Sequence, residues 1–150
     1  MSCQEAFIQR LRDQGFRLTP QRETILSTLH EIDKLTTAEE IHSRVRNHTP
    51  SIDISTIYRT LELLQKFGLV ACIEYGSDQR QYELLAAHAP HIHLVCRVCG
   101  EIISADIDIA QSLVDVLERG YSFQVDLEQL SIPGLCEACA ARQNLYEDAP

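Results

Sequence analysis

Two Cys-x-x-Cys pairs constrain this 150-residue chain more than any other feature of its sequence. The first pair is Cys96 and Cys99, followed by Gly100, and the second pair is Cys136 and Cys139, after 36 intervening residues. Each pair supplies two sulfur ligands from one tight turn, and two pairs complete the tetrahedral shell of Zn²⁺. A shell closed by four cysteines leaves no open position for catalysis. The spacing therefore predicts a structural zinc that ties together the two ends of a larger unit of helices and strands.

Redox chemistry is the main alternative for these cysteines, because a lone Cys-x-x-Cys can act as a thioredoxin-like dithiol. Two pairs favour one metal ion over two redox centres. The sequence begins without the basic and apolar stretches of a secretory signal. It also has no run approaching the ~18 apolar residues of a membrane span. We therefore expect a cytoplasmic protein with reduced thiols and no membrane partner.

The distribution of charge divides the chain into two halves. At face value, the net charge of −9 argues against a nucleic-acid partner. However, residues 1–82 carry 10 Lys and Arg against 11 Asp and Glu, whereas residues 83–150 carry 3 against 11. The basic side chains are concentrated in the first half, which indicates two domains with different roles. We place these predicted domains at residues 1–84 and 85–150.

The first half has the pattern of short helices followed by a hairpin. Apolar spacing, the Thr19-Pro20 start, the capping box that begins at Thr37, and the stops at Gly15 and Gly68 predict the helices. The predicted helices cover residues 4–14, 20–29, a stretch from 37 onward, and 55–67 with Asp53 or Ser55 as its cap, and the predicted strands cover 69–75 and 80–85 with a turn at 76–79. This order predicts a winged helix-turn-helix.

The fourth predicted helix would be the recognition helix of such a domain. Its exposed face carries Ser55, Thr56, Tyr58 and Arg59 near the N-terminal end, where base edges are normally read. An arginine can bond a guanine edge or a phosphate, and a tyrosine can contact a thymine methyl group or a phosphate. The same residues could equally form an ordinary solvated helix face, so periodicity alone leaves both interpretations open.

The second half has a mixed pattern of strands and helices. A strand leads into the first cysteine pair, and a return strand is predicted at 101–105. A helical stripe at Ile109, Leu113, Val116 and Leu117 ends at Gly120, and residues 122–132 alternate as a strand does. Such a unit has an exposed sheet edge that a second copy would cover, which favours a homodimer. The predicted fold class is therefore α+β, with an N-terminal winged helix and a small C-terminal αβ domain that holds the Cys₄ zinc.

A second metal site is indicated upstream of the first cysteine pair. His88, His91 and His93 lie within six residues, and His91 and His93 share one face of a strand. Glu83, at the end of the predicted wing, is a candidate third ligand with them. Imidazole and carboxylate ligands suit Zn²⁺, Fe²⁺ or Mn²⁺. The alternative is a fortuitous run of solvated loop histidines.

These motifs, taken in order, resemble those of the ferric uptake regulator (Fur) family of metal-dependent bacterial repressors. The resemblance runs from about residue 7 to about residue 140 and rests on Gly15-Phe-Arg-Leu-Thr-Pro-Gln-Arg22, Thr37-Ala-Glu-Glu-Ile41, Ile54-Ser-Thr-Ile-Tyr-Arg-Thr-Leu61, Gly68-Leu-Val70, Tyr82-Glu-Leu84, His91-Ile-His-Leu-Val-Cys-Arg-Val-Cys-Gly100 and the Cys136/Cys139 pair. It implies a DNA-binding domain at 1–84, a hinge, and a dimerisation and metal-binding domain at 85–150. It also implies that metal-loaded dimers bind palindromic operators on double-stranded DNA and act as repressors, not as enzymes.

The resemblance also assigns roles to individual residues. Arg17 matches a basic residue that reaches toward the minor groove, and Tyr58 and Arg59 match the Tyr-Arg of the recognition helix. The four cysteines match the structural zinc site, and Glu83, His91 and His93 match three ligands of a regulatory metal site. Two further ligand positions depart from the family pattern, because Leu35 replaces a histidine and Ser104 replaces an acid. Candidate substitutes are His42, Cys72 and His88, and an additional family site is expected to be lost because its ligand positions are Pro90, Ile92, Gln111 and Glu128.

The resemblance to the family also ranks the metals that the regulatory site could sense. Zinc-sensing relatives carry a cysteine at the position of Leu85, and peroxide-sensing relatives carry an aspartate at the position of Glu83. Iron is therefore the first choice, with zinc- or peroxide-sensing as the alternatives within the family. Outside it, a zinc-stabilised dithiol redox protein and a zinc-stabilised dimerisation module that ignores DNA remain alternatives. The His-x-Glu and Pro-Cys-x-x-Cys signatures of zinc deaminases are absent from the sequence.

Overall fold

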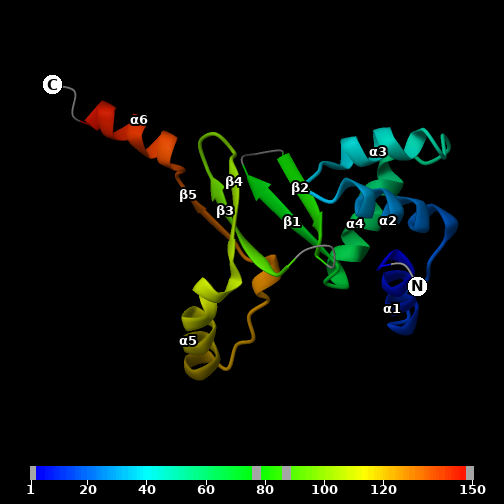
Figure 1. Ribbon diagram of the computed structural model, residues 1–150, viewed down its shortest axis with the longest axis horizontal. Helices are drawn as coiled ribbons and strands as arrows, with labels where there is room; N and C mark the ends of the chain where they lie inside the picture. Colours follow the sequence, from blue (N-terminus) through cyan, green and yellow to red (C-terminus); the bar gives the residue numbers. More distant parts are fainter. Residues whose placement is uncertain (1–2, 76–78, 86–88, 148–150) are drawn as a thin grey trace. The chain divides into compact units, whose positions relative to one another are not determined.

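The computed structural model describes residues 3–75, 79–85 and 89–147 of the chain (Figure 1). The chain divides into two compact units. The first unit is formed by Met1–Cys72 with Arg80–Ala89, and the second by Ile73–Gln79 with Pro90–Pro150. Within the described ranges, none of the helices has both the length and the apolar character that crossing a membrane requires.

The first unit has the winged helix-turn-helix architecture that the sequence predicts. Its elements are α1 (Cys3–Asp13), α2 (Pro20–Ile32), α3 (Ala38–Arg46), α4 (Ile54–Lys66), and the hairpin of β1 (Val70–Tyr75) and β2 (Gln79–Leu84). The tip of that hairpin belongs to the second unit. The turn predicted at 76–79 falls largely on residues 76–78, which lie outside the described residues.

Local capping fixes where these helices begin and end. The Thr19 and Thr37 hydroxyl oxygens accept the N–H groups three residues later, at 3.3 and 3.2 Å. For α4, the structure selects Asp53 as the cap, since its carboxylate accepts the N–H of Thr56 at 2.8 Å. These contacts satisfy backbone donors that have no partner inside the helix. Gly68, with a φ of 68°, ends α4 in the left-handed conformation that a side chain would disfavour.

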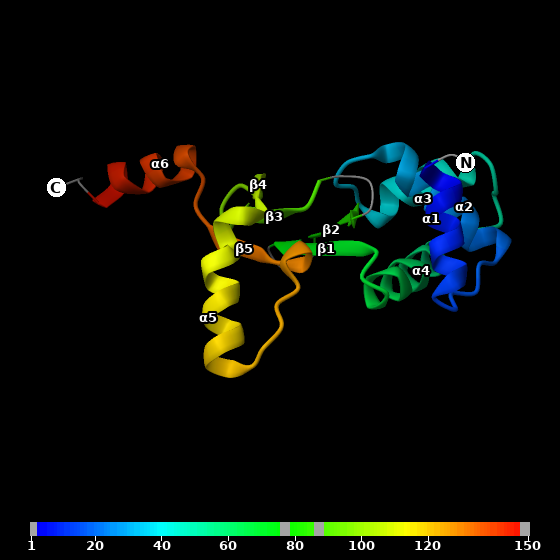
Figure 2. The same ribbon diagram turned by 60° about the horizontal axis from the view of Figure 1, so that its bottom comes forward.

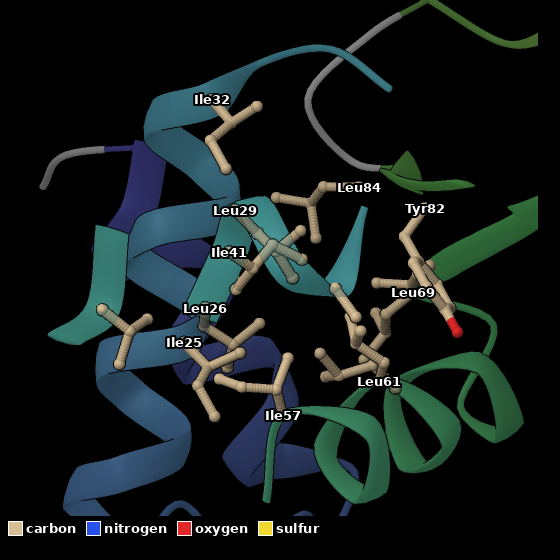
Figure 3. Packing of buried hydrophobic residues seen from close by; sticks show 14 of the residues in the cluster. Ile25, Leu26, Leu29, Ile32, Ile41, Ile57, Leu61, Leu69, Tyr82 and Leu84 are labelled. Carbon is tan, nitrogen blue, oxygen red and sulfur yellow. The ribbon is translucent and has the colours of Figure 1, made fainter. Parts of the chain in front are cut away.

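The core of the first unit lies between the helices and the base of the hairpin (Figure 3). Fully buried aliphatic side chains from α2, α3 and α4 converge there, and Leu69, Tyr82 and Leu84 close it from the hairpin side. Thr36 and Tyr82 exchange backbone hydrogen bonds of 3.0 and 2.7 Å, which add a third strand position to the wing. The wing is therefore fixed to the segment between α2 and α3.

The second unit is a three-stranded sheet with helical connections. Its elements are β3 (His91–Cys96), β4 (Ile102–Asp106), η2 (Ile107–Ala110), α5 (Gln111–Tyr121), η3 (Leu127–Gln129), β5 (Ser131–Gly134) and α6 (Glu137–Glu147). The central strand β3 pairs antiparallel with β4 and parallel with β5. Because β4 reverses the chain, the crossover from β4 through η2, α5 and the extended segment back to η3 brings β5 to the other side of β3 and parallel to it (Figure 2).

Two predictions for this crossover were wrong. The helix runs to Tyr121 and ends at Ser122, which has a φ of 51°, and not at Gly120. Residues 122–126 form no strand, and β5 begins only at Ser131. Alternation of apolar residues cannot distinguish a strand from an extended segment with solvent-facing apolar side chains. Phe123, whose side chain is 58% exposed, belongs to the second kind.

The buried cluster that the cysteines form in the second unit is small. Cys96, Cys136 and Cys139 are its buried members, and Leu135 packs against them. In contrast, the apolar stripe formed by Ile109 on η2 and by Leu113 and Val116 on α5 is exposed in the single chain. Apolar burial alone rarely stabilises a unit of about 70 residues. The second unit therefore needs a further source of stability, such as a bound metal or a partner surface.

Candidate metal centres and nucleic-acid face

The four predicted zinc ligands come together in the second unit. Cys96 ends β3, Cys99 lies in the following turn, and Cys136 and Cys139 stand at the start of α6. Their sulfur atoms all lie within 4.8 Å of one another, and the Sγ atoms of Cys99 and Cys136 are 3.7 Å apart. Two sulfurs on a tetrahedral zinc with Zn–S bonds of ~2.3 Å are about 3.8 Å apart. The cysteines are free thiols, so the arrangement fits a closed metal shell.

The backbone around the cluster favours a thiolate at one of the four positions. N–H groups of Cys136, Cys99 and Val98 donate to the Cys96 sulfur and lower its pKa to about 6. The Cys139 N–H lowers the pKa of Cys136, but the Glu101 carboxyl group and burial outweigh it and raise that pKa to about 12. Metal binding must therefore release protons from Cys136 and Cys139, whose pKa values are raised, which makes metal affinity depend on pH.

His91 and His93 form a second converging pair of ligands on β3. Their Nε2 atoms are 3.2 Å apart, and their ring centroids are separated by 4.7 Å with an interplanar angle of 74°. Two nitrogens bound to one tetrahedral metal at 2.0–2.1 Å lie about 3.3 Å apart. The His93 side chain is 1% exposed, so the pair is not a run of solvated loop histidines. The chemistry and spacing of these nitrogens fit a shared divalent cation.

The sheet register shows what surrounds the two histidines. Ser104 on β4 and Ser131 on β5 lie opposite His93. Where the family pattern has an acid, this chain therefore has the hydroxyl group of Ser104 beside His93. Asp106 lies opposite His91, but its Oδ1 accepts the Asp108 N–H at 2.9 Å as the cap of η2. No pattern in the sequence singles out Asp106, because only the strand register reveals its position.

The other residues proposed for this site lie in the first unit. Glu83 is a buried carboxyl group on β2, 6% exposed, and a buried carboxylate requires a compensating partner or metal. The Nε2 of His42 lies 3.0 Å from the Ile52 carbonyl oxygen, and Cys72 packs against the apolar core. Leu35 is half-buried beside the Thr36 bridge. His88 lies outside the described residues.

The N-terminal end of α4 is organised by Asp53. A single carboxylate oxygen accepts the Ser55 hydroxyl, the Thr56 hydroxyl and the Thr56 N–H, each at 2.8 Å. These bonds, led by that of the Thr56 hydroxyl, lower the pKa of Asp53 to about 2. Ser55 and Thr56 are therefore held as hydrogen-bond acceptors toward any approaching ligand, because their own hydroxyl protons are already donated.

The next turn of α4 carries Tyr58 and Arg59. The Arg59 guanidinium group is exposed and donates to the Ser55 hydroxyl at 3.1 Å, so it lies along its own helix. The Tyr58 hydroxyl donates to Glu39 on α3 at 2.7 Å. This contact was not predicted, since the two residues are 19 positions apart and no local pattern connects them.

Arg17 lies in the short segment between α1 and α2, with an exposed side chain. The guanidinium group of Arg22 donates to the Arg17 carbonyl at 2.7 Å and lies over the Phe16 ring at 5.5 Å. Arg22 therefore braces the backbone that presents Arg17.

The pKa of Asp53 leads to a prediction about stability and pH. Because folding lowers this pKa from 3.8 to about 2, the ionised carboxylate stabilises the folded state. That contribution is complete above pH 4 to 5 and declines as the pH falls toward 2. We expect Asp53→Asn to lower the melting temperature at pH 7, and the difference from wild type to shrink below about pH 4. Thermal unfolding of both proteins, down to the lowest pH at which they fold, measures this; a constant difference throughout would contradict it.

Comparison with known proteins identifies the family to which this fold belongs. The sequence model of the ferric uptake regulator family matches residues 13–132 of the chain. The ferric uptake regulation protein of Bacillus subtilis (strain 168) is 32% identical over 139 residues, which cover 90% of this chain and 93% of that protein. The peroxide-responsive repressor PerR of Staphylococcus saprophyticus is 30% identical over 135 residues, 90% of each chain.

A solved structure shows the same architecture. The ferric uptake regulator Fur of Helicobacter pylori aligns with a TM-score of 0.66 at 27% identity, covering 92% of this chain and 91% of that one. The family model spans most of the sequence and includes the recognition-helix motif, the histidine pair and the first cysteine pair. The chain therefore belongs to the ferric uptake regulator family.

Proposed function

We propose that this protein is a metal-responsive repressor of metal homeostasis genes that binds palindromic DNA operators as a homodimer. The observation that carries the proposal is the arrangement on β3, where a pair of converging histidines and a cysteine of a separate four-thiol cluster share one strand. A closed thiol cluster suits a permanent metal, and a histidine pair suits an exchangeable one. A four-thiol cluster and a histidine pair, in a chain that also folds a winged helix, support a sensor and not an enzyme.

The DNA-binding role is proposed for residues 1–84. The exposed Arg59 and the half-buried Tyr58 lie on α4, with Ser55 and Thr56 at its N-terminal end, and Arg17 is presented by a braced segment. In this arrangement α4 would enter the major groove and Arg17 would reach the adjacent backbone or minor groove. The negative net charge is compatible with this role, because phosphate contacts depend on local cations.

The metal-binding role divides between the two centres. Cys96, Cys99, Cys136 and Cys139 would hold a structural Zn²⁺, and Glu83, His91 and His93 would hold a second divalent cation. Bound metal supplies positive charge that holds these side chains together. In the mechanism that the family resemblance implies, bound metal would favour the DNA-competent conformation of the dimer. The affinity for DNA would then depend on metal.

Dimerisation is proposed for residues 85–150. The exposed apolar side chains of the second unit include Ile109 on η2, Leu113 and Val116 on α5, and Phe123 after the helix. Both β4 and β5 are edge strands of the three-stranded sheet. An apolar helix face and open sheet edges favour association with a second copy. A dimer would also match the symmetry of a palindromic site.

Iron is the sensed metal that we propose. Peroxide-sensing relatives carry an aspartate where this chain has Glu83, and zinc-sensing relatives carry a cysteine where it has Leu85. The 32% identical B. subtilis relative is a ferric uptake regulation protein, and the H. pylori protein is described as having three functional metal binding sites. A zinc- or peroxide-sensing role is the second candidate, supported by the 30% identical peroxide-responsive repressor.

Substitution of both Tyr58 and Arg59 by alanine tests the proposed recognition helix. Metal-loaded wild-type protein is first used to select binding duplexes from random double-stranded DNA. We expect the double variant to bind the selected duplex at least about 100-fold more weakly, since each lost base or phosphate contact is worth ~1–3 kcal/mol. Fluorescence anisotropy measures the affinity.

Two controls accompany this measurement. Lys66→Ala removes one positive charge from the opposite end of α4 and should change affinity little. The zinc content of the double variant should equal that of wild type, because both residues lie outside the metal-binding unit. Unchanged DNA affinity in the double variant would show that α4 is not the recognition helix.

A further inference from the structure

A hydrogen bond joins the proposed recognition helix α4 to the neighbouring helix α3. The Tyr58 hydroxyl donates to the Oε1 of Glu39 at 2.7 Å, and Glu39 lies in the first turn of α3. The Tyr58 ring also packs against the apolar core of the first unit. The side chain is thus held at both ends, by apolar contact along the ring and by a carboxylate at the hydroxyl group.

We propose that Glu39 is a positioning residue that fixes the Tyr58 side chain in the orientation used for DNA recognition. This inference rests on the proposed function of α4. A side chain that is ordered before binding loses less conformational entropy when the complex forms. Glu39 itself need not touch DNA for this effect, because it acts through the tyrosine ring that it holds.

The electrostatics of the pair support a persistent bond near neutral pH. The Tyr58 hydroxyl lowers the pKa of Glu39, and the Glu39 carboxylate in turn raises the pKa of Tyr58. Arg80 acts on Tyr58 in the opposite direction, and the Thr37 hydroxyl also bonds Glu39. The bond therefore joins an ionised carboxylate to a neutral hydroxyl group, the charge-assisted kind that is stronger than a neutral pair.

Two other roles for Glu39 make different predictions. As a simple negative charge near DNA, Glu39 would repel phosphates, and its removal would strengthen binding in any background. As an acidic residue in the first turn of α3, it would stabilise that helix, and its removal would lower the melting temperature. A positioning role predicts weaker DNA binding that depends on the Tyr58 hydroxyl group.

A double-mutant cycle separates these roles. Affinity for the selected duplex is measured for wild type, Glu39→Ala, Tyr58→Phe and the double variant, with zinc content and melting temperature as checks on folding. We expect Glu39→Ala to weaken binding about 3- to 10-fold, the range of one hydrogen bond. In the Tyr58→Phe background the same substitution should have no weakening effect, because the bond is already absent.

A conservative variant and a charge control complete the test. Glu39→Gln keeps an acceptor oxygen without the charge, and we expect it to bind DNA at least as well as wild type. Glu62→Gln removes the same charge from an exposed position on α4, away from the pair, and reports the effect of charge alone.

The possible results are distinct. Equal effects of Glu39→Ala in both backgrounds, or stronger binding in both, would overturn the positioning role while leaving DNA binding by α4 intact. Loss of binding that tracks a loss of folded protein, with no rescue by Glu39→Gln, would also overturn it. A wild-type protein that selects no duplex would overturn the proposed function and this inference together.

Discussion

Substitution of Cys136 by serine is expected to remove the tightly bound zinc and to destabilise the second unit by at least about 3 kcal/mol, given the ~10–16 kcal/mol apparent binding energies of structural zinc. The Cys136 sulfur lies 3.7 Å from that of Cys99, inside a cluster whose members all lie within 4.8 Å. A serine hydroxyl group cannot replace this thiolate as a zinc ligand at neutral pH. The same cysteines form the buried cluster at this end of the unit, so loss of metal also loosens its packing.

Metal content per chain, measured by mass spectrometry after mild chelation, tests this expectation. Wild type should retain about one zinc ion and Cys136→Ser close to none. Cys72→Ser is the matched control, because it makes the same atomic change at a cysteine of the first unit that lies outside the four-thiol cluster. We expect that control to keep its zinc and its melting transition. A full zinc complement in Cys136→Ser would mean that the four thiols do not form one closed shell.

Substitution of His93 by alanine is expected to abolish the exchangeable metal while leaving the structural zinc in place. His93 is buried and its Nε2 lies 3.2 Å from that of His91, so one substitution breaks the converging pair. We expect at least a ~100-fold loss of affinity for the second metal, because a direct ligand contributes more than the 10- to 100-fold of an outer partner. DNA binding should then no longer respond to added Fe²⁺ or Mn²⁺.

Anaerobic titration of Fe²⁺ or Mn²⁺, followed by anisotropy of the selected duplex, measures both effects. His48→Ala is the control, since His48 is exposed in the first unit and outside both metal centres. It should leave metal affinity and metal-dependent DNA binding unchanged. If His93→Ala retains a second metal and a metal-dependent DNA affinity, the sensing site must lie elsewhere in the chain.

The sequence predicted those features that depend on short-range chemistry. Ligand spacing located the cysteine cluster, because two Cys-x-x-Cys turns can converge in few ways. Capping residues located the helix starts at Thr19 and Thr37, since a cap and its partner lie three positions apart. Strand periodicity likewise placed His91 and His93 on one face, and their converging nitrogens confirm it.

The features that were missed depend on the tertiary structure. The Tyr58–Glu39 bond joins two helices, and the parallel placement of β5 beside β3 depends on how the crossover folds. Alternation suggested one long strand over 122–132, whereas η3 and a separate short strand occupy that stretch. Sequence pattern also could not show that the Ser55 and Thr56 hydroxyl protons are donated to Asp53.

Strand β3 carries residues of both candidate metal centres, since His91, His93 and Cys96 all lie on it. Cys96 at its end is tied through the thiol cluster to α6, while Ser131 and Gly134 of β5 pair with His93 and Cys96. A slip of one residue in this register would turn both histidines to the opposite face of the sheet. Under the proposed function, an empty thiol cluster would therefore loosen the strand register that brings the Nε2 atoms of His91 and His93 together.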